Sequence, residues 1–121
     1  MPLMKIHNNI SLKTFNTFGI DVNASQFVEV HSIEDLKEVL HYIKENQLNY
    51  YILGGGSNIL FTRDFDGVVV HIQTKGIAIT RQSQHAVLVK VSAGENWHDW
   101  VMWSLEQGYS GLENLALIPG N

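Results

Sequence analysis

Hydrophobic residues recur with two different spacings in the first half of the chain, and each spacing predicts an element. Residues 26–31 alternate between two faces, which is typical of a short strand. From Ser32 the apolar side chains return every three or four positions, which predicts a helix that begins with a Ser-x-x-Asp capping box and ends near Asn46. Residues 50–53 form a short apolar run, as in a buried strand. This order predicts a right-handed βαβ unit with parallel strands.

The second half of the chain extends the sheet and then changes its pattern. Residues 68–72 predict another buried strand, which gives the βαβ layer about three parallel strands. Residues 77–79 and 87–91 alternate around a polar turn, which is typical of an antiparallel hairpin. Residues 95–107 predict a second helix, with Trp103 outside its buried stripe. That stripe consists of Trp97, Trp100, Val101 and Leu105.

The change from parallel to antiparallel patterning divides the chain. We expect an α+β fold in which residues 1–75 form a first subdomain and residues 76–121 begin a second one. Within the first subdomain, residues 1–25 show little periodicity and predict an irregular arm. A turn in this arm should pack Phe15 and Phe18 into the core.

The stretch Leu53-Gly54-Gly55-Gly56-Ser57-Asn58 is the strongest candidate site. Glycines let a ligand approach the bare backbone, successive N–H groups can form a concave anion site, and Ser57 and Asn58 add side-chain donors. These features predict a phosphate or pyrophosphate cradle; a tight loop whose glycines only satisfy geometry is the alternative. A P-loop is excluded because Ser57 follows Gly56 and no Gly-Lys pair is present, and a Rossmann fingerprint is excluded because Ile59 occupies its third glycine position.

The composition argues against several classes of partner and site. The 121 residues include eight Lys and Arg and 12 Asp and Glu, for a formal net charge of -4. Because the basic residues are scattered, we expect neither nucleic acid nor a membrane surface as partner. The absence of cysteine excludes disulfides and thiolate metal sites. With no apolar leader in residues 1–10 and no bilayer-length apolar run, we expect a cytoplasmic protein.

Candidate catalytic chemistry is sparse in this chain. The six histidines form no pair or cluster at ligand spacing, so we expect no metal site. His98, in the second predicted helix, is the most interesting of them, although an exposed helix position is the simpler interpretation. The helix dipole or solvent exposure likewise explains Glu95, Glu106 and Glu113. We therefore assign no catalytic residue here.

Four motifs together resemble a known family. They are Asn16-Thr17-Phe18-Gly19, the loop with its flanks at residues 52–60, Gly94-Glu95-Asn96-Trp97-His98, and Gly-Leu-Glu-Asn-Leu-Ala-Leu-Ile-Pro-Gly at residues 111–120. In this order and at these distances they resemble the N-terminal part of the bacterial UDP-N-acetylenolpyruvoylglucosamine reductase family, within the vanillyl-alcohol-oxidase-like FAD-binding superfamily. The resemblance covers essentially the whole chain.

The resemblance implies a flavoenzyme of peptidoglycan synthesis. In this family NADPH reduces FAD, the reduced flavin gives hydride to the enolpyruvyl double bond of a UDP-sugar, and a protein acid supplies the proton. It implies that Ile118, Pro119 and Gly120 approach the flavin or its ribityl chain and that Thr17 lines the same cleft. The residues implied to cradle the FAD pyrophosphate are Leu53, Gly54, Gly55, Gly56, Ser57 and Asn58.

The last residues set further expectations. The chain stops in an apolar run followed by Pro119-Gly120-Asn121, whereas domains usually end in polar, exposed residues. Asn121 also stands where the family usually has a small residue. We expect a truncated second subdomain, no substrate-binding domain and no proton donor, so that the chain alone is inactive. The alternative is a nucleotide-binding or interaction module completed by another chain, by strand exchange or by dimerisation.

Overall fold

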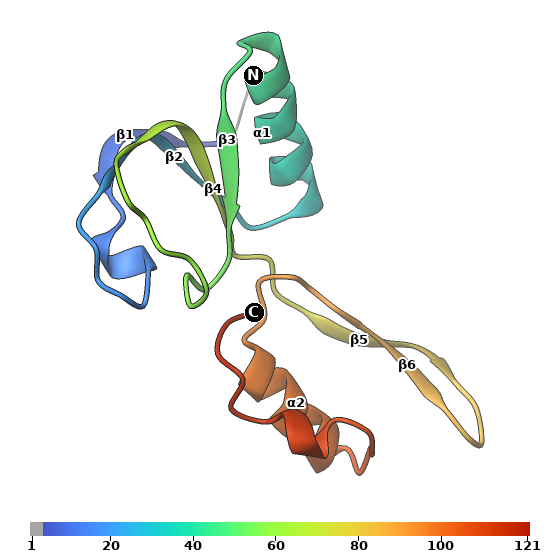
Figure 1. Cartoon of the computed structure of the whole chain (residues 1–121). Coiled ribbons are helices and arrows are strands. Elements are labelled where there is room, and N and C mark those ends of the chain that lie inside the picture. The colour runs from blue at the N-terminus through green and yellow to red at the C-terminus, as the bar shows by residue number, and fades with distance from the viewer. Residues whose placement is uncertain (1–3) are drawn as a thin grey trace.

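The larger of the two sheets has four strands, one more than the sequence predicts. In the computed structural model, which describes residues 4–121, their spatial order is β1 (Ile6–Ser11), β2 (Asn23–Val30), β4 (Phe65–Ile72) and β3 (Tyr50–Leu53) (Figure 1). Strands β2, β4 and β3 are parallel, as predicted, and β1 pairs antiparallel with β2. The prediction of an irregular arm is therefore wrong where these two strands pair. The burial predicted for residues 50–53 is wrong except at Leu53, because β3 lies at the edge of the sheet.

Strand β4 is one of the two interior strands of this sheet, and its valines are buried on both faces. Val68 and Val70 pack toward helix α1 (Ile33–Glu45), whereas Val69 belongs to the core on the opposite face. Such β-branched runs suit a parallel strand that is covered on both sides. Helix α1 covers one face of the sheet (Figure 1).

Helix α1 begins where the capping box predicts. The Ser32 hydroxyl accepts the Asp35 N–H at 3.1 Å, and the Asp35 carboxylate accepts the His31 N–H at 2.9 Å. The first bond satisfies one unpaired N–H of the first helical turn, and the second satisfies the N–H of the residue before the N-cap. Val39 and Ile43 are buried against the sheet. The prediction of βαβ connectivity is confirmed.

The N-terminal segment between β1 and β2 forms a loop that covers the other face of the sheet. Phe15 packs against Phe27 with 4.8 Å between ring centroids, as predicted. Phe18 is 64% exposed, so its predicted burial is wrong. The reason is local: a turn runs from Asn16 to Gly19, closed by the Gly19 N–H and the Asn16 carbonyl at 3.2 Å, and Phe18 stands at its tip.

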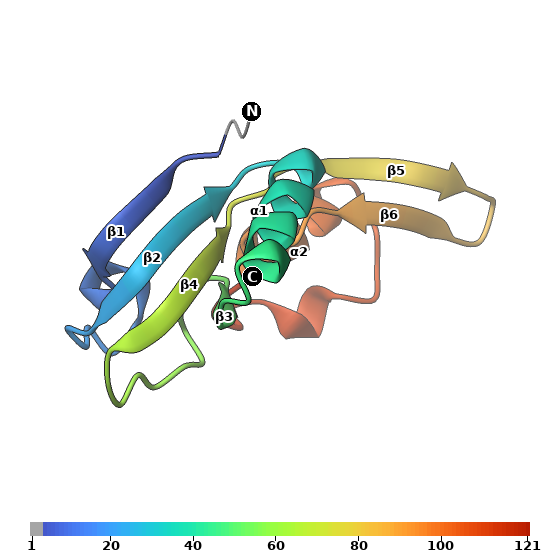
Figure 2. The same cartoon turned by 90° about the horizontal axis from the view of Figure 1, so that it is seen from above.

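The second unit consists of a hairpin and a helix. Strands β5 (Ile77–Gln82) and β6 (Val87–Val91) pair antiparallel, which confirms the predicted hairpin. Figure 2 shows this hairpin extending away from the four-stranded sheet. Helix α2 (Trp97–Glu106) and a short 3-10 turn (Glu113–Leu115) follow.

Helix α2 has defined caps at both ends. At its start the Asn96 side chain accepts the Asp99 N–H at 3.0 Å, so the helix begins later than predicted. At its end the Gly108 N–H reaches the Leu105 carbonyl and the Tyr109 N–H reaches the Ser104 carbonyl, each at 2.9 Å. This is the Schellman arrangement, in which Gly108 takes the left-handed conformation with φ of +78°.

The buried stripe of α2 differs from the prediction. Trp103, expected outside the stripe, is half-buried and stacks on Trp100 with 5.7 Å between centroids. Leu105, expected inside, is 39% exposed, while Val101 and Ser104 are buried. Trp103 also contacts Tyr109 beyond the end of the helix, with 6.1 Å between ring centroids, so residues outside α2 contribute to its burial.

Candidate functional site

The glycine loop follows β3 at the carboxyl end of the parallel strands. Residues 53–59 line a cleft of about 320 Å³, together with Tyr51 on the same side and Pro119, Gly120 and Asn121 on the other. The glycine loop and the segment that contains Pro119 and Gly120, which the sequence analysis proposed as binding residues, therefore lie on two sides of one cleft. The carboxyl edge of a parallel sheet is also where ligands of open α/β folds bind.

The loop presents unpaired hydrogen-bond donors. Within residues 4–121, the backbone N–H groups of residues 55–58 donate to no other protein group. The side chains of Ser57 and Asn58 also have no partner in this part of the chain. A run of backbone N–H groups that lacks internal acceptors favours an anion.

Gly54 and Gly55 direct their missing side chains toward the opposite wall. A Cβ atom at Gly55 would lie 2.7 Å from the Asn121 Oδ1 and 3.2 Å from the Gly120 Cα. At Gly54 the nearest atom would be in the Asn121 side chain, 3.8 Å away. The bare backbone of both residues faces the cleft, so a bulky group can approach it closely.

The described lining contains no Asp, Glu, Lys, Arg or His. A diphosphate at the loop would therefore meet peptide dipoles and neutral side chains, and no lining carboxylate would repel it. Such dipoles interact favourably with an anion without the desolvation that a buried lysine or arginine would require. The donor set, the bare glycine backbone and the absence of lining acids fit a pyrophosphate group.

The wall opposite the loop is held by the first turn of α2. The Trp97 N–H donates to the Gly120 carbonyl at 2.9 Å, and the Trp97 indole N–H donates to the Leu115 carbonyl at 2.9 Å. The His98 Nδ1 accepts the Leu117 N–H at 2.9 Å. Helix α2 thereby fixes the backbone that faces the glycine loop.

Sequence reasoning missed these roles of Trp97 and His98. It placed Trp97 in a buried stripe and left His98 without a function, because nothing in their spacing connects them to residues 115–120. The available signal is the shared motif context, since both residues belong to one of the four motifs that carry the resemblance. Only the folded chain shows which backbone groups they bind.

Ile118 and Thr17 lie next to the cleft and are not among its lining residues. Ile118 is 47% exposed and precedes Pro119 in the wall segment. Thr17 approaches the loop through its backbone, because its N–H donates to the Gly56 carbonyl at 3.0 Å.

His71 supports the end of β3 from the neighbouring strand. It is buried and pairs in register with Leu53, and its ring lies 5.2 Å from that of Phe15. Burial lowers the pKa of His71 below its ordinary value of 6.5, although Glu29, whose carboxylate lies 3.8 Å from Nδ1, acts in the opposite direction. The ring is therefore neutral near pH 7.

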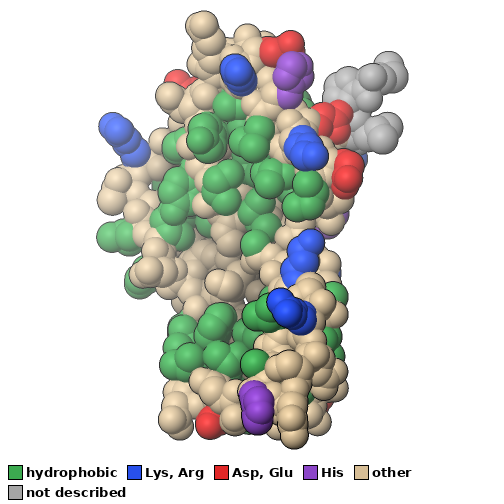
Figure 3. Space-filling model, turned by 90° about the vertical axis from the view of Figure 1, so that its right-hand side faces the viewer, with side chains coloured by type: hydrophobic (Ala, Val, Ile, Leu, Met, Phe, Trp, Pro, Cys, Tyr) green, Lys and Arg blue, Asp and Glu red, His purple; other side chains and the backbone are tan. Residues whose placement is uncertain are grey.

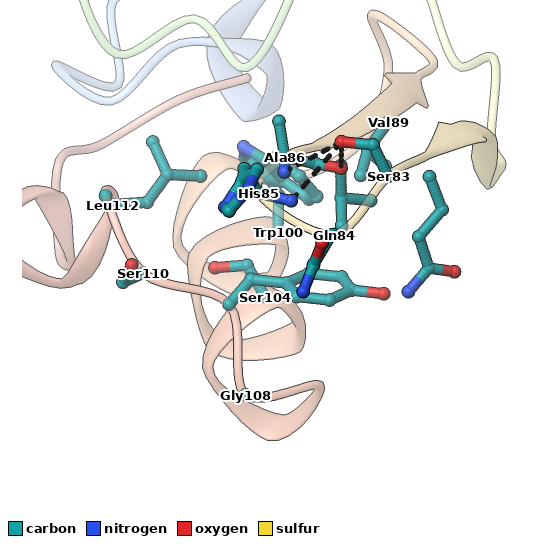
Figure 4. Close-up of a pocket in the computed structure, with 14 residues that line it drawn as sticks. Ser83, Gln84, His85, Ala86, Val89, Trp100, Ser104, Gly108, Ser110 and Leu112 are labelled. Atoms are coloured by element: carbon teal, nitrogen blue, oxygen red, sulfur yellow. Dashed lines mark hydrogen bonds between the residues drawn. The ribbon is translucent and has the colours of Figure 1, made fainter.

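A second cleft, of about 540 Å³, lies between the hairpin turn and the end of α2 (Figure 4). In that turn the Ser83 hydroxyl accepts the N–H groups of His85 and Ala86 at 3.4 and 3.1 Å. Neither the glycine loop nor residues 115–121 line this cleft. It carries no part of the site that the sequence predicts.

The described residues contain neither a cluster of metal ligands nor a helix that could span a membrane. Across residues 4–121, no group of three or more His, Cys, Asp or Glu side chains is placed to hold a metal ion. No helix in the same range is long and apolar enough to cross a membrane.

Comparison with known proteins defines the class first. A profile of the family described as FAD binding domain matches residues 24–121, which include the glycine loop and the opposite wall. The chain belongs to this FAD binding domain family. Its cofactor is accordingly FAD.

Individual relatives are more specific than the family profile. The chain is 50% identical over 119 residues to UDP-N-acetylenolpyruvoylglucosamine reductase of Flavobacterium johnsoniae and 45% identical over 117 residues to that of Pseudomonas fluorescens. These matches cover 98% and 97% of this chain but 34% of each relative, so the chain spans about a third of their length. It corresponds to the N-terminal part of these reductases.

A solved structure agrees with these matches. The crystal structure of UDP-N-acetylenolpyruvylglucosamine reductase (MurB) from Thermus caldophilus superimposes with a TM-score of 0.69 at 27% identity, over 98% of this chain and 40% of that one. The resemblance noted in the sequence is therefore confirmed, and so is the α+β fold class.

Proposed function

We propose that this chain supplies the FAD pyrophosphate site of a reductase that converts UDP-N-acetylglucosamine enolpyruvate to UDP-N-acetylmuramate. The observation that carries the proposal is the glycine loop, whose N–H groups at residues 55–58 are free within the described chain and face a cleft without acidic residues. When bound, FAD supplies hydride transfer from NADPH to the substrate double bond.

Each part of the cleft has a distinct role in this proposal. Residues Leu53 to Asn58 hold the diphosphate through backbone N–H groups and through the hydroxyl and amide of Ser57 and Asn58. Ile118, Pro119 and Gly120 place a rigid backbone along the flavin or its ribityl chain, held there by α2. Thr17 contributes at the edge of the cleft.

The proposal also concerns how the polypeptide is divided into subdomains. We infer a first subdomain at residues 1–75 and the beginning of a second at 76–121, with the cleft between them. We assign the groups that bind the UDP-sugar and donate the proton to residues outside this chain, because the chain spans about a third of the length of its relatives. This chain alone is then expected to show no reductase activity with NADPH.

An NMR titration of the ¹⁵N-labelled chain tests the cradle. FAD and ADP carry a diphosphate, whereas riboflavin does not. We expect FAD and ADP to shift the amide resonances of residues 55–58 and riboflavin to leave them in place. Because part of the cleft is assigned to other residues, we expect weak binding and little flavin in the purified chain. Unchanged loop amides at millimolar FAD and ADP would contradict the proposal.

The variant Gly55→Val sharpens this test. Its side chain would occupy the cleft, where the nearest neighbours are Asn121, Gly120 and Ser57, so strand pairing should not change. We expect loss of the FAD-induced shifts and unaltered amide resonances in β4. Ala78→Val in the exposed hairpin adds bulk away from the cleft and serves as the matched control. FAD binding by Gly55→Val at wild-type affinity would refute the assignment of this loop.

A further inference from the structure

Gly56 lacks a side chain for a different reason from Gly54 and Gly55. A Cβ atom at Gly56 would lie 1.9 Å from the Phe15 carbonyl oxygen and 2.8 Å from the Asn16 Cα, and the residue has φ of +72°. Both features require glycine. Gly56 therefore packs its backbone against the N-terminal loop, on the side away from the cleft wall that Gly54 and Gly55 face.

The same loop holds the carbonyl of Gly56. The Thr17 N–H donates to that oxygen at 3.0 Å. A trans peptide is planar, and its C=O and N–H point in opposite directions; the described chain contains no cis peptide. Holding the Gly56 carbonyl toward Thr17 therefore directs the Ser57 N–H away from Thr17. Ser57 itself lines the cleft.

Asn16 fixes the conformation of the N-terminal loop. Its side chain is 8% exposed and makes three hydrogen bonds to backbone groups four residues away on either side. The Nδ2 donates to the Leu12 carbonyl at 2.7 Å and to the Ile20 carbonyl at 3.1 Å, and the Oδ1 accepts the Ile20 N–H at 3.0 Å. The side chain joins both legs of the loop and satisfies backbone groups that would otherwise be unpaired.

The N-terminal loop is also anchored to the sheet that carries the glycine loop. Leu12 is fully buried, and Phe15 lies with its ring centroid 4.8 Å from that of Phe27 on β2 and 5.2 Å from that of His71 on β4. His71 in turn pairs with Leu53, the residue before the glycines. Both sides of the Thr17–Gly56 contact thus rest on the same core.

We propose that the loop from Leu12 to Ile20 is the back wall of the FAD cradle and that Asn16 is a positioning residue, acting through the Thr17 N–H on the Gly56–Ser57 peptide. This inference rests on the proposed function, because it concerns the same diphosphate site. It assigns Thr17 a role through its backbone N–H. The Asn-Thr-Phe motif then serves to position the Gly56–Ser57 peptide. Neither Asn16 nor Phe15 is among the residues that line the cleft.

Thr17→Pro tests the contact directly, because proline has no backbone N–H to donate. It also removes the threonine side chain, and Thr17→Ala controls for that loss. The preceding residue, Asn16, already has φ of -137° and ψ of 146°, which is the conformation that proline requires before it. In the ligand-free chain we expect a displaced Ser57 amide resonance and faster hydrogen exchange in residues 55–58. With FAD we expect the dissociation constant to rise about fivefold, the factor that one ordinary hydrogen bond supplies. Thr17→Ala keeps the N–H and should weaken FAD binding less.

Asn16→Asp is the second test, because it keeps the shape of the side chain and removes the two Nδ2–H donors. We expect it to move the same Ser57 resonance as Thr17→Pro. Asn46→Asp is the matched control, since Asn46 also donates from Nδ2 to a backbone carbonyl, at 2.9 Å, at the exposed end of α1. That control should leave Ser57 in place. If Asn16→Asp does not fold, Thr17→Pro decides the question.

The outcomes separate this inference from the proposed function. Wild-type Ser57 resonance and exchange in Thr17→Pro would overturn the back wall, whether or not FAD binds. An effect of Thr17→Ala equal to that of Thr17→Pro would assign the role to the side chain and would overturn the backbone mechanism. Displaced Ser57 signals in a chain that binds no FAD would support the back wall while contradicting the cradle.

Discussion

At the scale of single residues, His71 connects the core to the glycine loop and carries the clearest pH dependence. The ring is buried against both Phe15 and Phe27, and the Gln73 side-chain nitrogen lies 2.8 Å from its Nε2. A neutral imidazole can accept a hydrogen bond from that amide, whereas the protonated ring cannot. Protonation would place a charge in the core, and the half-exposed Glu29 does not fully offset the cost of burying it.

We expect the stability of the chain to fall as the pH drops below about 6.5. Burial, opposed by Glu29 and assisted by His31, lowers the pKa of His71 in the folded state, so the unfolded chain binds the proton first. The stabilisation is complete above 6.5 and is lost as the pH falls through the folded-state value. Urea denaturation between pH 5 and 8 measures it.

His71→Gln removes the titrating ring and should flatten this part of the pH profile. His41→Gln, an equivalent substitution at an exposed position of α1, should keep the wild-type profile. A profile in which His41→Gln flattens the curve and His71→Gln does not would reject this assignment.

At the scale of elements, the sequence predicts a helix cap, a helix end or a hairpin correctly where the interactions that form it are local. The Ser32 cap, the Gly108 stop and the hairpin all depend on residues that lie close together in the chain, and each is visible in the sequence. Strand β1 was missed because its sequence, Ile-His-Asn-Asn-Ile-Ser, has little strand character. It becomes a strand by pairing with β2 at the sheet edge, and that tertiary contact outweighs propensity.

The N-cap of α1 gives a prediction at this scale. Ser32→Ala removes the acceptor for the Asp35 N–H, and we expect a loss of about 1 kcal/mol in the free energy of unfolding. Urea denaturation followed by circular dichroism measures the change. Ser32→Asp keeps a capping oxygen and should remain near wild type. Equal stability of the Ala variant and the wild type would show that the cap contributes nothing.

At the scale of the whole molecule, the two units differ in how well their strands are covered. β4 is buried over most of its length, whereas β5 and β6 form a two-stranded sheet with exposed or half-buried residues. Figure 3 shows hydrophobic side chains on the surface of both units. An apolar cleft of about 820 Å³ lies between them, lined in part by Ile33, Leu40, Tyr50 and Ile52, each of which is exposed by more than a third.

Hydrogen exchange should reproduce this difference. We expect amides of Val68, Val69 and Val70 to exchange more slowly than those of β5 and β6 by more than about tenfold, because a lone two-stranded sheet is marginal in water. Measuring at two protein concentrations distinguishes the monomer from the alternative of dimerisation or strand exchange. Protection of the hairpin that rises with concentration, together with an earlier elution in size-exclusion chromatography, would favour that alternative.

The sequence alone determined the α+β class, the three parallel strands, the hairpin and the glycine loop, because each is encoded by neighbouring residues or by a contiguous motif. Only the tertiary structure decided what surrounds that loop. Gly56 packs against Phe15 and Thr17, while Gly54 and Gly55 face Gly120 and Asn121. Glycine is needed at these positions for different reasons, and the reasons come from segments far away in the chain. Contacts of this kind depend on how the chain folds back on itself, which no local pattern specifies.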